Sequence, residues 1–587
     1  MHNKKKLVLL VAALCCVPVL AFAESALPLS DDGGEASARI RILSPDDVRL
    51  YRAIFENERT GNFAQADADI ARLSDTSLMG YVKAEHTLSS HSKRTPLAEL
   101  NDWLRDFGDL SIAKRIYNLA ARRARKSKGG VEDIPGFSKR GGGYEDTDIA
   151  DQPLSSASAR ALATRVEAAI RASNPAEAQS LVQGLVDYSP PPASDIARLV
   201  QRVAASYIAE GLDQNAYDYG STQVGSPSAP LLYWYVGFAA YRLGNYADAA
   251  KNFEALAQVG SVPSWTRGQA AFWAARAYGS LGQPLKIVSL LTAAAREQPT
   301  FYGILAERIL GMPGHTVFLE PNLEPDNFLA LMRVPAAHRA VALWQVGRLD
   351  DVPNEMNRAL AAIDLKLGST YAGVARQMGL PNLELRASET AASRGEMLSG
   401  LYPVPGYMPE GGYRIDPSLV LAFARIESRF KPDETSYAGA RGLMQLMPGT
   451  AKHVANGNVG DLGDPPHNMY LGQLYLFELL DDLNGNLVEV AASYNAGPGN
   501  LTRWMARPGT KADPLLFMES IPISQTRNYV KRVMMYHWMY GRRLGEDTPS
   551  LDQTARGDWP LYDQRKPVKP IPRVLPVKKT DVVASAH

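Results

Sequence analysis

Cysteine is nearly absent from this sequence of 587 residues. Its two cysteines, Cys15 and Cys16, are adjacent and lie in an apolar segment close to the N-terminus. If that segment is removed on export, the remaining chain has no cysteine, and its folding cannot depend on disulfide bonds. Histidine is also scarce, with 9 residues. Because His453 and His467 are isolated from other metal-binding residues, the sequence implies no metal and no cofactor.

An excess of charge of one sign is lacking as well. The chain has 63 Lys and Arg residues against 62 Asp and Glu residues, a balance that gives no support for nucleic-acid binding. Hydrophobic residues make up 45% and charged residues 21%, which fits a globular protein and argues against disorder of the whole chain. A single core stops growing well below this length, so about two to four domains are expected.

The N-terminus carries an apolar run, residues 7–20, that is too short to span a membrane comfortably. Three lysines precede it, and an Ala-Phe-Ala sequence follows it with the small residues that a signal peptidase reads. We expect residues 1–23 to be a cleaved signal peptide, with a mature chain that starts near Glu24, resides in the periplasm and has no stable membrane anchor. A lipoprotein anchor is the alternative, although Leu14 precedes Cys15 where a small residue would be needed.

Residues 36–400 are helical in pattern and rich in Ala, Leu and Arg. Two stretches, 241–246 and 278–283, each begin with an aromatic residue and contain a Leu-Gly-polar turn, and apolar residues at helical spacing follow both. This pattern predicts antiparallel helix pairs that stack as in tetratricopeptide-like repeats, with an irregular period. We therefore expect a mainly α protein in which residues 24–400 form an α-superhelical solenoid with a linker region.

Three segments interrupt the helical pattern. Residues 126–153 are rich in glycine and scattered charge, which indicates a loop or an insertion, with an active-site lid as the alternative. Pro and Gly residues between 402 and 412 mark the entry to a separate domain, expected over 401–545. Residues 546–587 become rich in Pro and Lys without periodicity, and this composition predicts a disordered tail, with a basic wall-contacting role as the alternative.

The pair Asp416-Pro417 predicts a helix start, because Asp is a good N-cap and Pro is favoured at the first helical position. In the helix that follows, Val420, Phe423 and Glu427 lie at i, i+3 and i+7, so the carboxyl shares the apolar face. A carboxyl held against apolar neighbours favours its neutral form, which a general acid needs at neutral pH. The alternative is a solvated glutamate at the edge of the apolar stripe.

Three further clusters follow Glu427 in order. Residues 436–448 contain glycines, which let the backbone approach a ligand closely, and Gln445, whose amide can donate to and accept from sugar amides. Residues 491–499 place a Tyr and an Asn just before a Gly-Pro turn. Residues 519–530 begin with a Glu-Ser-Ile-Pro sequence and end with Thr-Arg-Asn-Tyr-Val.

Over residues 411–540 this ordered set resembles the soluble lytic transglycosylases, large periplasmic murein lyases with a goose-lysozyme-like catalytic domain. The motifs that carry the resemblance are Glu-Ser at 427–428, Gly-Leu-Met-Gln at 442–445, Tyr-Asn-Ala-Gly at 494–497, and Glu519 with Tyr529. Over residues 36–400 the resemblance is one of architecture alone, a helical superhelix ahead of the catalytic domain. It implies a lysozyme-like, predominantly helical catalytic domain that acts on the glycan strands of peptidoglycan.

The resemblance also implies roles for individual residues. Glu427 would be the single acid and base. The residues that would assist the reaction, line the glycan groove or contact the substrate are Ser436, Gln445, Met447, Tyr494, Asn495 and Glu519. Tyr529 would be either a groove residue or a buried structural tyrosine, and Ser428 and Met444 are open to the same alternative.

The chain departs from the family pattern at Gln525, where members often have an acidic residue. This substitution puts a local ion pair to Arg527 in doubt. Ser493 also replaces a more usual alanine-like neighbour, which is a small change.

The motif set offers one obvious catalytic carboxylate, whereas ordinary glycosidases use two. A lytic transglycosylase can work with one. Glu427 would protonate the oxygen of the MurNAc-β-1,4-GlcNAc bond and then take the proton of the C6 hydroxyl of MurNAc, which closes a 1,6-anhydro ring. The alternatives are a lysozyme-like hydrolase of the same bond and an inactive wall-binding scaffold.

The superhelix is the part whose role the sequence explains least. We expect it to restrict which glycan strands reach the groove, or to bind proteins of the cell-wall machinery. On this interpretation, removal of residues 36–400 would leave the chemistry of bond cleavage intact.

Overall fold

The computed structural model describes residues 40–127, 130–134, 153–188, 190–312, 314, 318–507 and 510–563. Over these ranges the chain forms 27 α-helices and three short 3-10 helices, and its β-structure is limited to isolated bridges. The prediction of a mainly α protein with a helical superhelix is therefore confirmed. The expected signal peptide lies outside the described residues, as does most of the expected loop at 126–153.

The chain divides into two compact units, each built from separate segments of the sequence. The first unit includes residues 145–316 and 408–572, and the second includes residues 26–144 and 317–407. Part of the expected superhelix thus belongs to the same unit as the expected catalytic domain.

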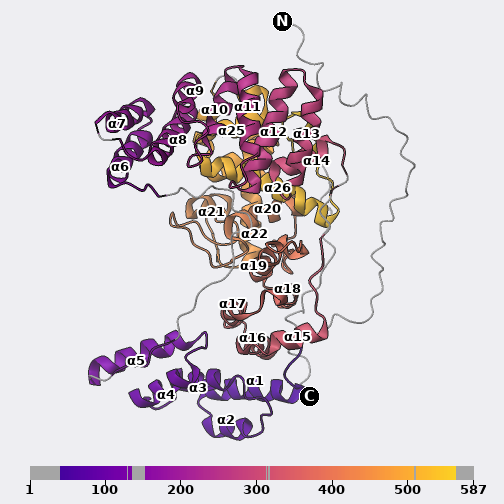
Figure 1. Ribbon diagram of the computed structural model, residues 1–587. Helices are drawn as coiled ribbons and strands as arrows, with labels where there is room; N and C mark the ends of the chain where they lie inside the picture. The colour runs from indigo at the N-terminus through magenta and orange to yellow at the C-terminus, as the bar shows by residue number, and fades with distance from the viewer. Residues whose placement is uncertain are drawn as a thin grey trace. The chain divides into compact units, whose positions relative to one another are not determined.

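In the first unit, successive helices of the N-terminal segment pack as antiparallel pairs (Figure 1). They are α6 (Ala157–Arg171), α7 (Pro175–Tyr188), α8 (Ala193–Glu210), α9 (Asp213–Ser221), α10 (Leu232–Arg242), α11 (Tyr246–Ala257), α12 (Ser264–Ser280), α13 (Pro284–Arg296) and α14 (Phe301–Ile309). The predicted turn at 243–245 joins α10 to α11. Gly244 adopts φ = 80° there, a left-handed conformation that glycine takes without a steric penalty. Trp273 of α12 is fully buried among the aromatic side chains of α10 and α11.

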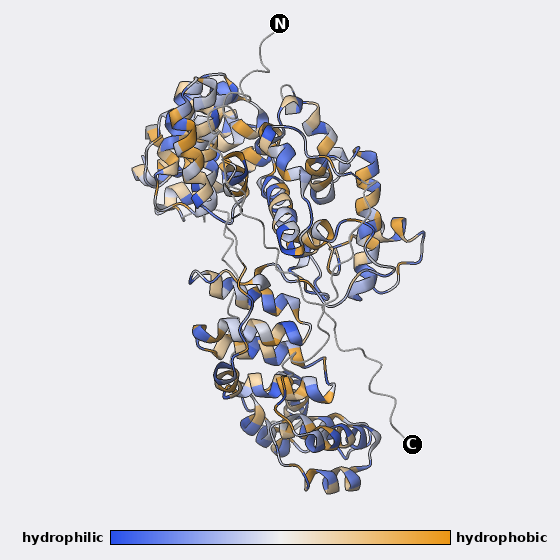
Figure 2. Ribbon diagram, turned by 90° about the vertical axis from the view of Figure 1, so that its right-hand side faces the viewer, coloured by the Kyte–Doolittle hydropathy of each residue, from blue (hydrophilic) through white to orange (hydrophobic). Residues whose placement is uncertain are grey.

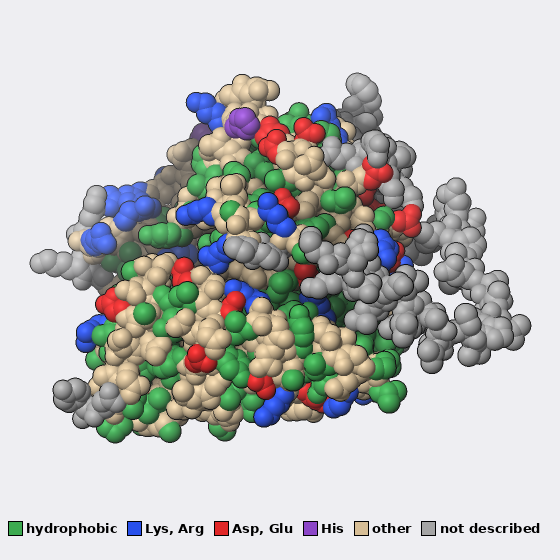
Figure 3. Space-filling model, turned by 90° about the horizontal axis from the view of Figure 1, so that it is seen from above, with side chains coloured by type: hydrophobic (Ala, Val, Ile, Leu, Met, Phe, Trp, Pro, Cys, Tyr) green, Lys and Arg blue, Asp and Glu red, His purple; other side chains and the backbone are tan. Residues whose placement is uncertain are grey.

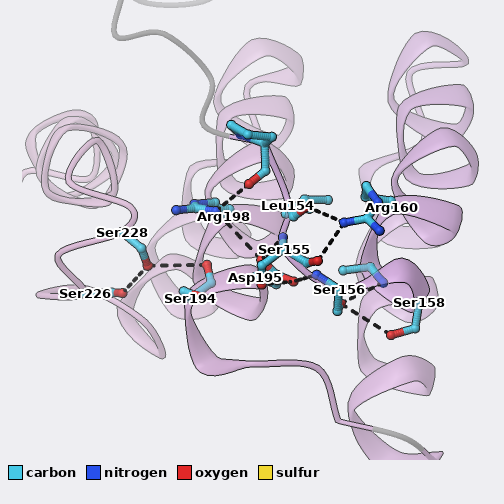
Figure 4. A network of polar contacts seen from close by, with 12 residues as sticks. Leu154, Ser155, Ser156, Ser158, Arg160, Ser194, Asp195, Arg198, Ser226 and Ser228 are labelled. Atoms are coloured by element: carbon cyan, nitrogen blue, oxygen red, sulfur yellow. Dashed lines mark hydrogen bonds and ion pairs between the residues drawn. The ribbon is translucent and has the colours of Figure 1, made fainter.

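Asp195 on α8 fixes the chain segment that leads into α6 (Figure 4). Its carboxylate accepts hydrogen bonds from the backbone N–H groups of Ser155 (2.9 Å) and Ser156 (2.8 Å), and from the Ser155 hydroxyl (3.1 Å). Burial disfavours the charged form of Asp195, but these hydrogen bonds together outweigh that effect and lower its pKa to about 2. The bonds anchor the first helix pair of the unit.

The C-terminal segment of the first unit supplies a second helical cluster. Its elements are α20 (Pro417–Ser428), α21 (Pro448–Val454), α22 (Pro465–Asp482), α23 (Leu487–Ala496), α24 (Pro498–Met505), η3 (Thr510–Ala512), α25 (Pro514–Ser520), α26 (Ser524–Leu544) and α27 (Pro549–Arg556). The predicted helix start is confirmed, with Asp416 at the N-cap position and Pro417 as the first helical residue. Helix α26 packs against both α20 and α23 and forms the centre of this cluster.

The second unit is also helical and has its own hydrophobic core. Its elements are α1 (Pro45–Thr60), α2 (Phe63–Ile70), α3 (Met79–Leu88), α4 (Leu97–Phe107), α5 (Ala113–Ser127), α15 (Pro325–Met332), α16 (Pro335–Val346), α17 (Val352–Ala362), η1 (Leu365–Leu367), α18 (Gly368–Gln377), α19 (Pro381–Ala392) and η2 (Ser399–Leu401). Glu355 of α17 is fully buried and accepts hydrogen bonds from Tyr81 (2.8 Å), from the Ser111 N–H (2.7 Å) and from Arg339 (2.9 Å). The core thus joins the α1–α5 segment to α16 and α17.

Most helices of both units mix hydrophobic and hydrophilic residues along their length, as amphipathic helices do (Figure 2). On the face seen from above, acidic and basic side chains are interspersed with apolar ones (Figure 3). Among the described helices, none combines the length and the hydropathy needed to cross a bilayer.

The described part of the predicted tail is ordered. Residues 546–563 contain α27, whose Leu551 is buried, and Pro560 and Tyr562 bond to the backbone at 485–487. The expectation of disorder from residue 546 does not hold for this part, because apolar residues there find a packing surface on the helical cluster. Residues 564–587 lie outside the described residues.

Candidate active site

Glu427 lies in the last turn of α20, whose residues from Pro417 to Arg425 are all buried. The helix ends immediately after Ser428, because Arg429 and Phe430 both adopt left-handed conformations, with φ of 53° and 61°. Such conformations are costly for residues other than glycine, and strain of this kind is common at functional sites. The sharp exit leaves the Glu427 side chain partly exposed at the end of a largely buried helix.

Tyr529 of α26 holds the Glu427 carboxyl directly. Its hydroxyl donates a hydrogen bond of 2.5 Å to Oε1 of Glu427. Burial raises the pKa of Glu427 to about 7, and the Tyr529 hydrogen bond opposes that rise because it stabilises the carboxylate. A carboxyl with a pKa near neutrality can give up a proton and take one back at the same pH.

Tyr494 of α23 forms the second aromatic wall beside Glu427. Its ring lies 4.8 Å from that of Phe423, one turn before Glu427 on α20, and 5.2 Å from that of Tyr475. Its hydroxyl donates a 2.7 Å hydrogen bond to the carbonyl of Met444. Burial, followed by the neighbouring charge of Glu427, raises the pKa of Tyr494 well above its usual range. Tyr494 is therefore a neutral donor that connects α23 to the loop after α20.

This loop, residues 435–446, is held by backbone bridges from Arg441 to Thr435 and to Leu446. Gly442 is buried with φ = 78°, and an added Cβ would lie 2.2 Å from both Asn468 Nδ2 and the Leu462 carbonyl oxygen. Only glycine fits that position.

The fully buried Asn468 of α22 supports the loop from beneath. It accepts the Met444 N–H (2.8 Å) and donates to the carbonyls of Arg441 (3.1 Å) and Leu462 (3.0 Å). One amide thus ties α22 to three backbone groups around the motif.

The structure places four of the remaining candidate residues at or near this loop and α23. Gln445 donates both amide hydrogens to backbone carbonyls, of Glu434 (3.0 Å) and Gly442 (2.9 Å), so its amide oxygen is the atom left for a ligand. The Ser436 hydroxyl accepts the Ala440 N–H (2.9 Å). Met447 is 43% exposed ahead of α21. Asn495 accepts a 2.7 Å hydrogen bond from Thr526, which leaves its amide nitrogen as a donor.

Glu519 lies in a different environment from the other candidates. Its side chain is fully buried, and Oε1 accepts hydrogen bonds from the Tyr302 hydroxyl (2.6 Å) and from Lys531 Nζ (2.9 Å). A direct contact with substrate would require this carboxylate to become accessible. Arg527, whose ion pair the substitution at Gln525 put in doubt, lies 3.8 Å from Glu519 and donates to the Ile521 carbonyl.

Ser428 and Met444, which like Tyr529 were open to a packing role, are both buried. Ser428 bonds back to the Ala424 carbonyl (3.1 Å), and Met444 packs against Gly472 of α22. His453 and His467 pair with Glu478 and Glu410, respectively, at 3.2 and 2.8 Å.

Sequence reasoning missed several residues that build the site. These residues act through contacts between segments that are distant in the sequence. They are Asn468, Phe423 (a ring partner of Tyr494), Tyr302 and Lys531. Lys531 had a detectable signal, because a lysine in the apolar stripe of a helix requires a buried acid as its partner.

Residues 408–517 match the model of the family described as the Transglycosylase SLT domain. Over 153 residues the chain is 40% identical to the soluble lytic murein transglycosylase of Escherichia coli K12. This segment of the chain is therefore similar to the catalytic domain model of the soluble lytic transglycosylases. The chain is also 38% identical over 142 residues to the soluble lytic murein transglycosylase of Salmonella typhimurium. These alignments span 25% and 23% of this chain and 24% and 22% of the relatives, so the chain aligns with about a quarter of each.

Solved structures of lytic transglycosylases share the fold over most of the chain. The inactive mutant of the lytic transglycosylase Slt from Pseudomonas aeruginosa has a TM-score of 0.58 at 20% identity, covering 88% of this chain and 99% of the other. The 70 kDa soluble lytic transglycosylase of Escherichia coli has a TM-score of 0.52 at 19% identity with the same coverage. A complex of the 70 kDa soluble lytic transglycosylase with bulgecin A has a TM-score of 0.53 at 20% identity, covering 88% of this chain and 100% of the other.

Proposed function

We propose that this chain is a peptidoglycan lytic transglycosylase, a carbon-oxygen lyase that cleaves the MurNAc-β-1,4-GlcNAc bond without water. The observation that carries the proposal is the Glu427 carboxyl, partly exposed at the end of α20, with a pKa of about 7 and a hydrogen bond to Tyr529. The similarity of residues 408–517 to the Transglycosylase SLT domain, and of the chain to a soluble lytic murein transglycosylase, supports the substrate class.

Glu427 starts the reaction as an acid. Its proton passes to the oxygen of the glycosidic bond, the bond between that oxygen and C1 of MurNAc breaks, and GlcNAc leaves as an alcohol. The N-acetyl group of MurNAc stabilises the positive charge that develops at C1. The Tyr529 hydrogen bond strengthens as Glu427 becomes a carboxylate, which favours the charged state that follows proton transfer.

The same carboxylate then acts as a base. It takes the proton of the MurNAc C6 hydroxyl while that oxygen bonds to C1, and a 1,6-anhydro ring closes. Glu427 ends protonated, as it began, and no water is consumed. The C6 hydroxyl is tethered to the reacting sugar, so its effective concentration exceeds that of a bound water.

The electrostatics around Glu427 support a single-carboxylate mechanism. A second carboxylate about 5 Å away, as retaining glycosidases have, would raise the pKa of Glu427 by repulsion. Within the described residues, burial and the Tyr529 hydrogen bond are the two influences on this pKa, and neither comes from an acid.

The polar groups on the loop and on α23 are proposed to hold the glycan. The Gln445 amide oxygen can accept from a sugar N–H, while the Asn495 amide nitrogen and the Ser436 hydroxyl can donate to sugar oxygens. Met447 offers an exposed apolar surface for a sugar face. Residues 1–23 are proposed to direct the chain to the periplasm, where peptidoglycan lies.

Digestion of purified sacculi tests this function. We expect muropeptides with 1,6-anhydro-MurNAc ends, each lighter by one water than the hydrolysed product in mass spectrometry. Reducing MurNAc ends throughout would identify a lysozyme-like hydrolase. Absence of any release, with binding to sacculi retained, would identify a wall-binding scaffold.

A further inference from the structure

A buried polar network joins the helical repeats of the first unit to α25 and α26. Tyr302 of α14 donates to Oε1 of Glu519 (2.6 Å) and accepts from Trp273 Nε1 of α12 (2.9 Å). Lys531 of α26 donates to the same Glu519 oxygen (2.9 Å). The side chains of Glu519 and Lys531 are 0% and 1% exposed. A buried ion pair depends on its surrounding hydrogen bonds, so Tyr302 is part of what keeps these charges in place.

Other contacts fix α26 to α14 along the same helix face. Lys531, Trp538 and Arg542 follow the spacing i, i+7 and i+11 and therefore share one face. The Trp538 ring stacks on Phe301 of α14 at 5.2 Å, and Arg542 pairs with the buried Glu307 of α14 at 2.7 Å. Helix α26 is thus held by α14 over three turns.

The opposite face of α26 presents the partner of Glu427. Tyr529 is two residues from Lys531, about 200° around the helix, and Tyr536 follows Tyr529 at i+7. The guanidinium of Arg425 lies 4.2 Å from the Tyr536 ring centre, so this second face packs on α20. A rotation or shift of α26 would therefore displace the Tyr529 hydroxyl from Glu427.

We propose that Tyr302 is a positioning residue for the acid and base Glu427, acting through Glu519, Lys531 and α26 on the hydrogen bond from Tyr529. This inference rests on the proposed role of Glu427. It assigns part of the superhelix to the chemistry itself, in contrast to the expectation that removal of residues 36–400 leaves cleavage intact. It also assigns Glu519 to the support of α26.

The test is Tyr302→Phe in the full chain, which removes one oxygen and keeps the ring. We expect kcat for muropeptide release to fall on the order of 10-fold, with KM within about 2-fold of the parent value. Because a weakened Tyr529 bond no longer lowers the pKa of Glu427 as strongly, the alkaline limb of the kcat profile should move to higher pH. On a Tyr529→Phe background, Tyr302→Phe should shift this limb no further.

Tyr207→Phe is the matched control. Tyr207 is another buried tyrosine of the first unit, whose hydroxyl donates to Gln179 at 2.7 Å. Tyr207→Phe should lower the Tm by an amount similar to that of Tyr302→Phe. It should keep the kcat and the pH profile of the parent. Equal kcat and pH limbs for Tyr302→Phe and Tyr207→Phe would overturn the proposal.

Glu519→Gln is a second variant in case Tyr302→Phe does not fold. It removes the charge opposite Lys531 and should shift the alkaline limb in the same direction. A rise in KM alone, with kcat and the limb unchanged, would make Glu519 a substrate contact and contradict the inference. If the parent released no muropeptides, the proposed function would fail. In that case carbon NMR would measure the pKa of Glu427 in the parent and in Tyr302→Phe, with Glu427→Gln used to assign the signal. A higher pKa in Tyr302→Phe would support the inference, and an equal pKa would contradict it.

Discussion

The Tyr529 hydroxyl lies 2.5 Å from Oε1 of Glu427 and donates a hydrogen bond to it. This hydrogen bond opposes the rise in the pKa of Glu427 that burial causes. The pair connects α26 to the last turn of α20, and the two residues are 102 positions apart in the sequence. The pKa of the acid is therefore set by the packing of α26 as well as by the apolar face of α20.

The first prediction concerns Tyr529→Phe. Loss of the hydrogen bond should raise the pKa of Glu427 above about 7, because the carboxylate loses a stabilising donor. The proton-donating form is lost as pH rises through this pKa, so the alkaline limb of muropeptide release should move to higher pH. The rate at its optimum should fall, on the order of 10-fold to 100-fold. Rates measured over a pH series check this.

Tyr562→Phe is the control for Tyr529→Phe. Its hydroxyl accepts the Asp416 N–H (3.0 Å) at the start of α20, about 16 Å along the helix from Glu427. It should leave the pH limb in place. An identical profile for the parent and Tyr529→Phe would contradict the assigned role of the hydrogen bond.

The second prediction concerns Tyr494→Phe, which removes the donor to the Met444 carbonyl. A lost buried hydrogen bond costs about 1–3 kcal/mol, and here the cost falls on the loop that presents Gln445. We expect KM for glycan strands to rise about 5-fold or more while the alkaline limb stays near its parent position. An unchanged KM with a reduced kcat would instead place the Tyr494 hydroxyl in the chemical step.

The third prediction compares two glycines of the loop. Gly442→Ala should destabilise the first unit by more than about 2 kcal/mol, since the new Cβ collides with Asn468 and the Leu462 carbonyl oxygen at 2.2 Å. Gly439 has a similar φ of 90° with no atom within 4 Å of its would-be Cβ, so Gly439→Ala should cost only the conformational strain, about 1 kcal/mol. Urea unfolding measures both. Equal losses would show that the contact with Asn468 is unimportant.

Some features of the fold could be predicted from the sequence and others could not. The turns at Leu243-Gly244 and Leu281-Gly282 and the start of α20 follow from local chemistry, and the structure contains them where they were expected. The division into two units does not follow, because it depends on which helices of distant segments share a core. Apolar periodicity gives the buried face of a helix and leaves its partner undetermined.

The same limit applies to the site. The apolar face around Glu427 was readable from spacing alone, and its structural consequence is the raised pKa. Glu519 belongs to the set of motifs that carries the resemblance, which implied a substrate contact for it. Its burial beside Tyr302 and Lys531 depends on a helix more than 200 residues earlier, which no local pattern indicates.

The fourth prediction concerns the pH dependence of stability at Asp195. Its pKa is about 2 in the folded chain and close to 3.8 when unfolded, so the unfolded state binds the proton first as the pH falls. The stabilisation is complete above about pH 4 and is lost as the pH drops toward 2. Thermal unfolding of Asp195→Asn should therefore show a lower Tm than the parent at pH 5 and a smaller difference near pH 2. A constant difference would contradict the linkage.

Mass spectrometry of the muropeptides released from sacculi by the parent and by Glu427→Gln tests the central claim most directly. The single-carboxylate account predicts 1,6-anhydro-MurNAc ends from the parent and a loss of release on the order of 1,000-fold or more in the variant. Release by Glu427→Gln at the parent rate, or hydrolysed reducing ends from the parent, would contradict it.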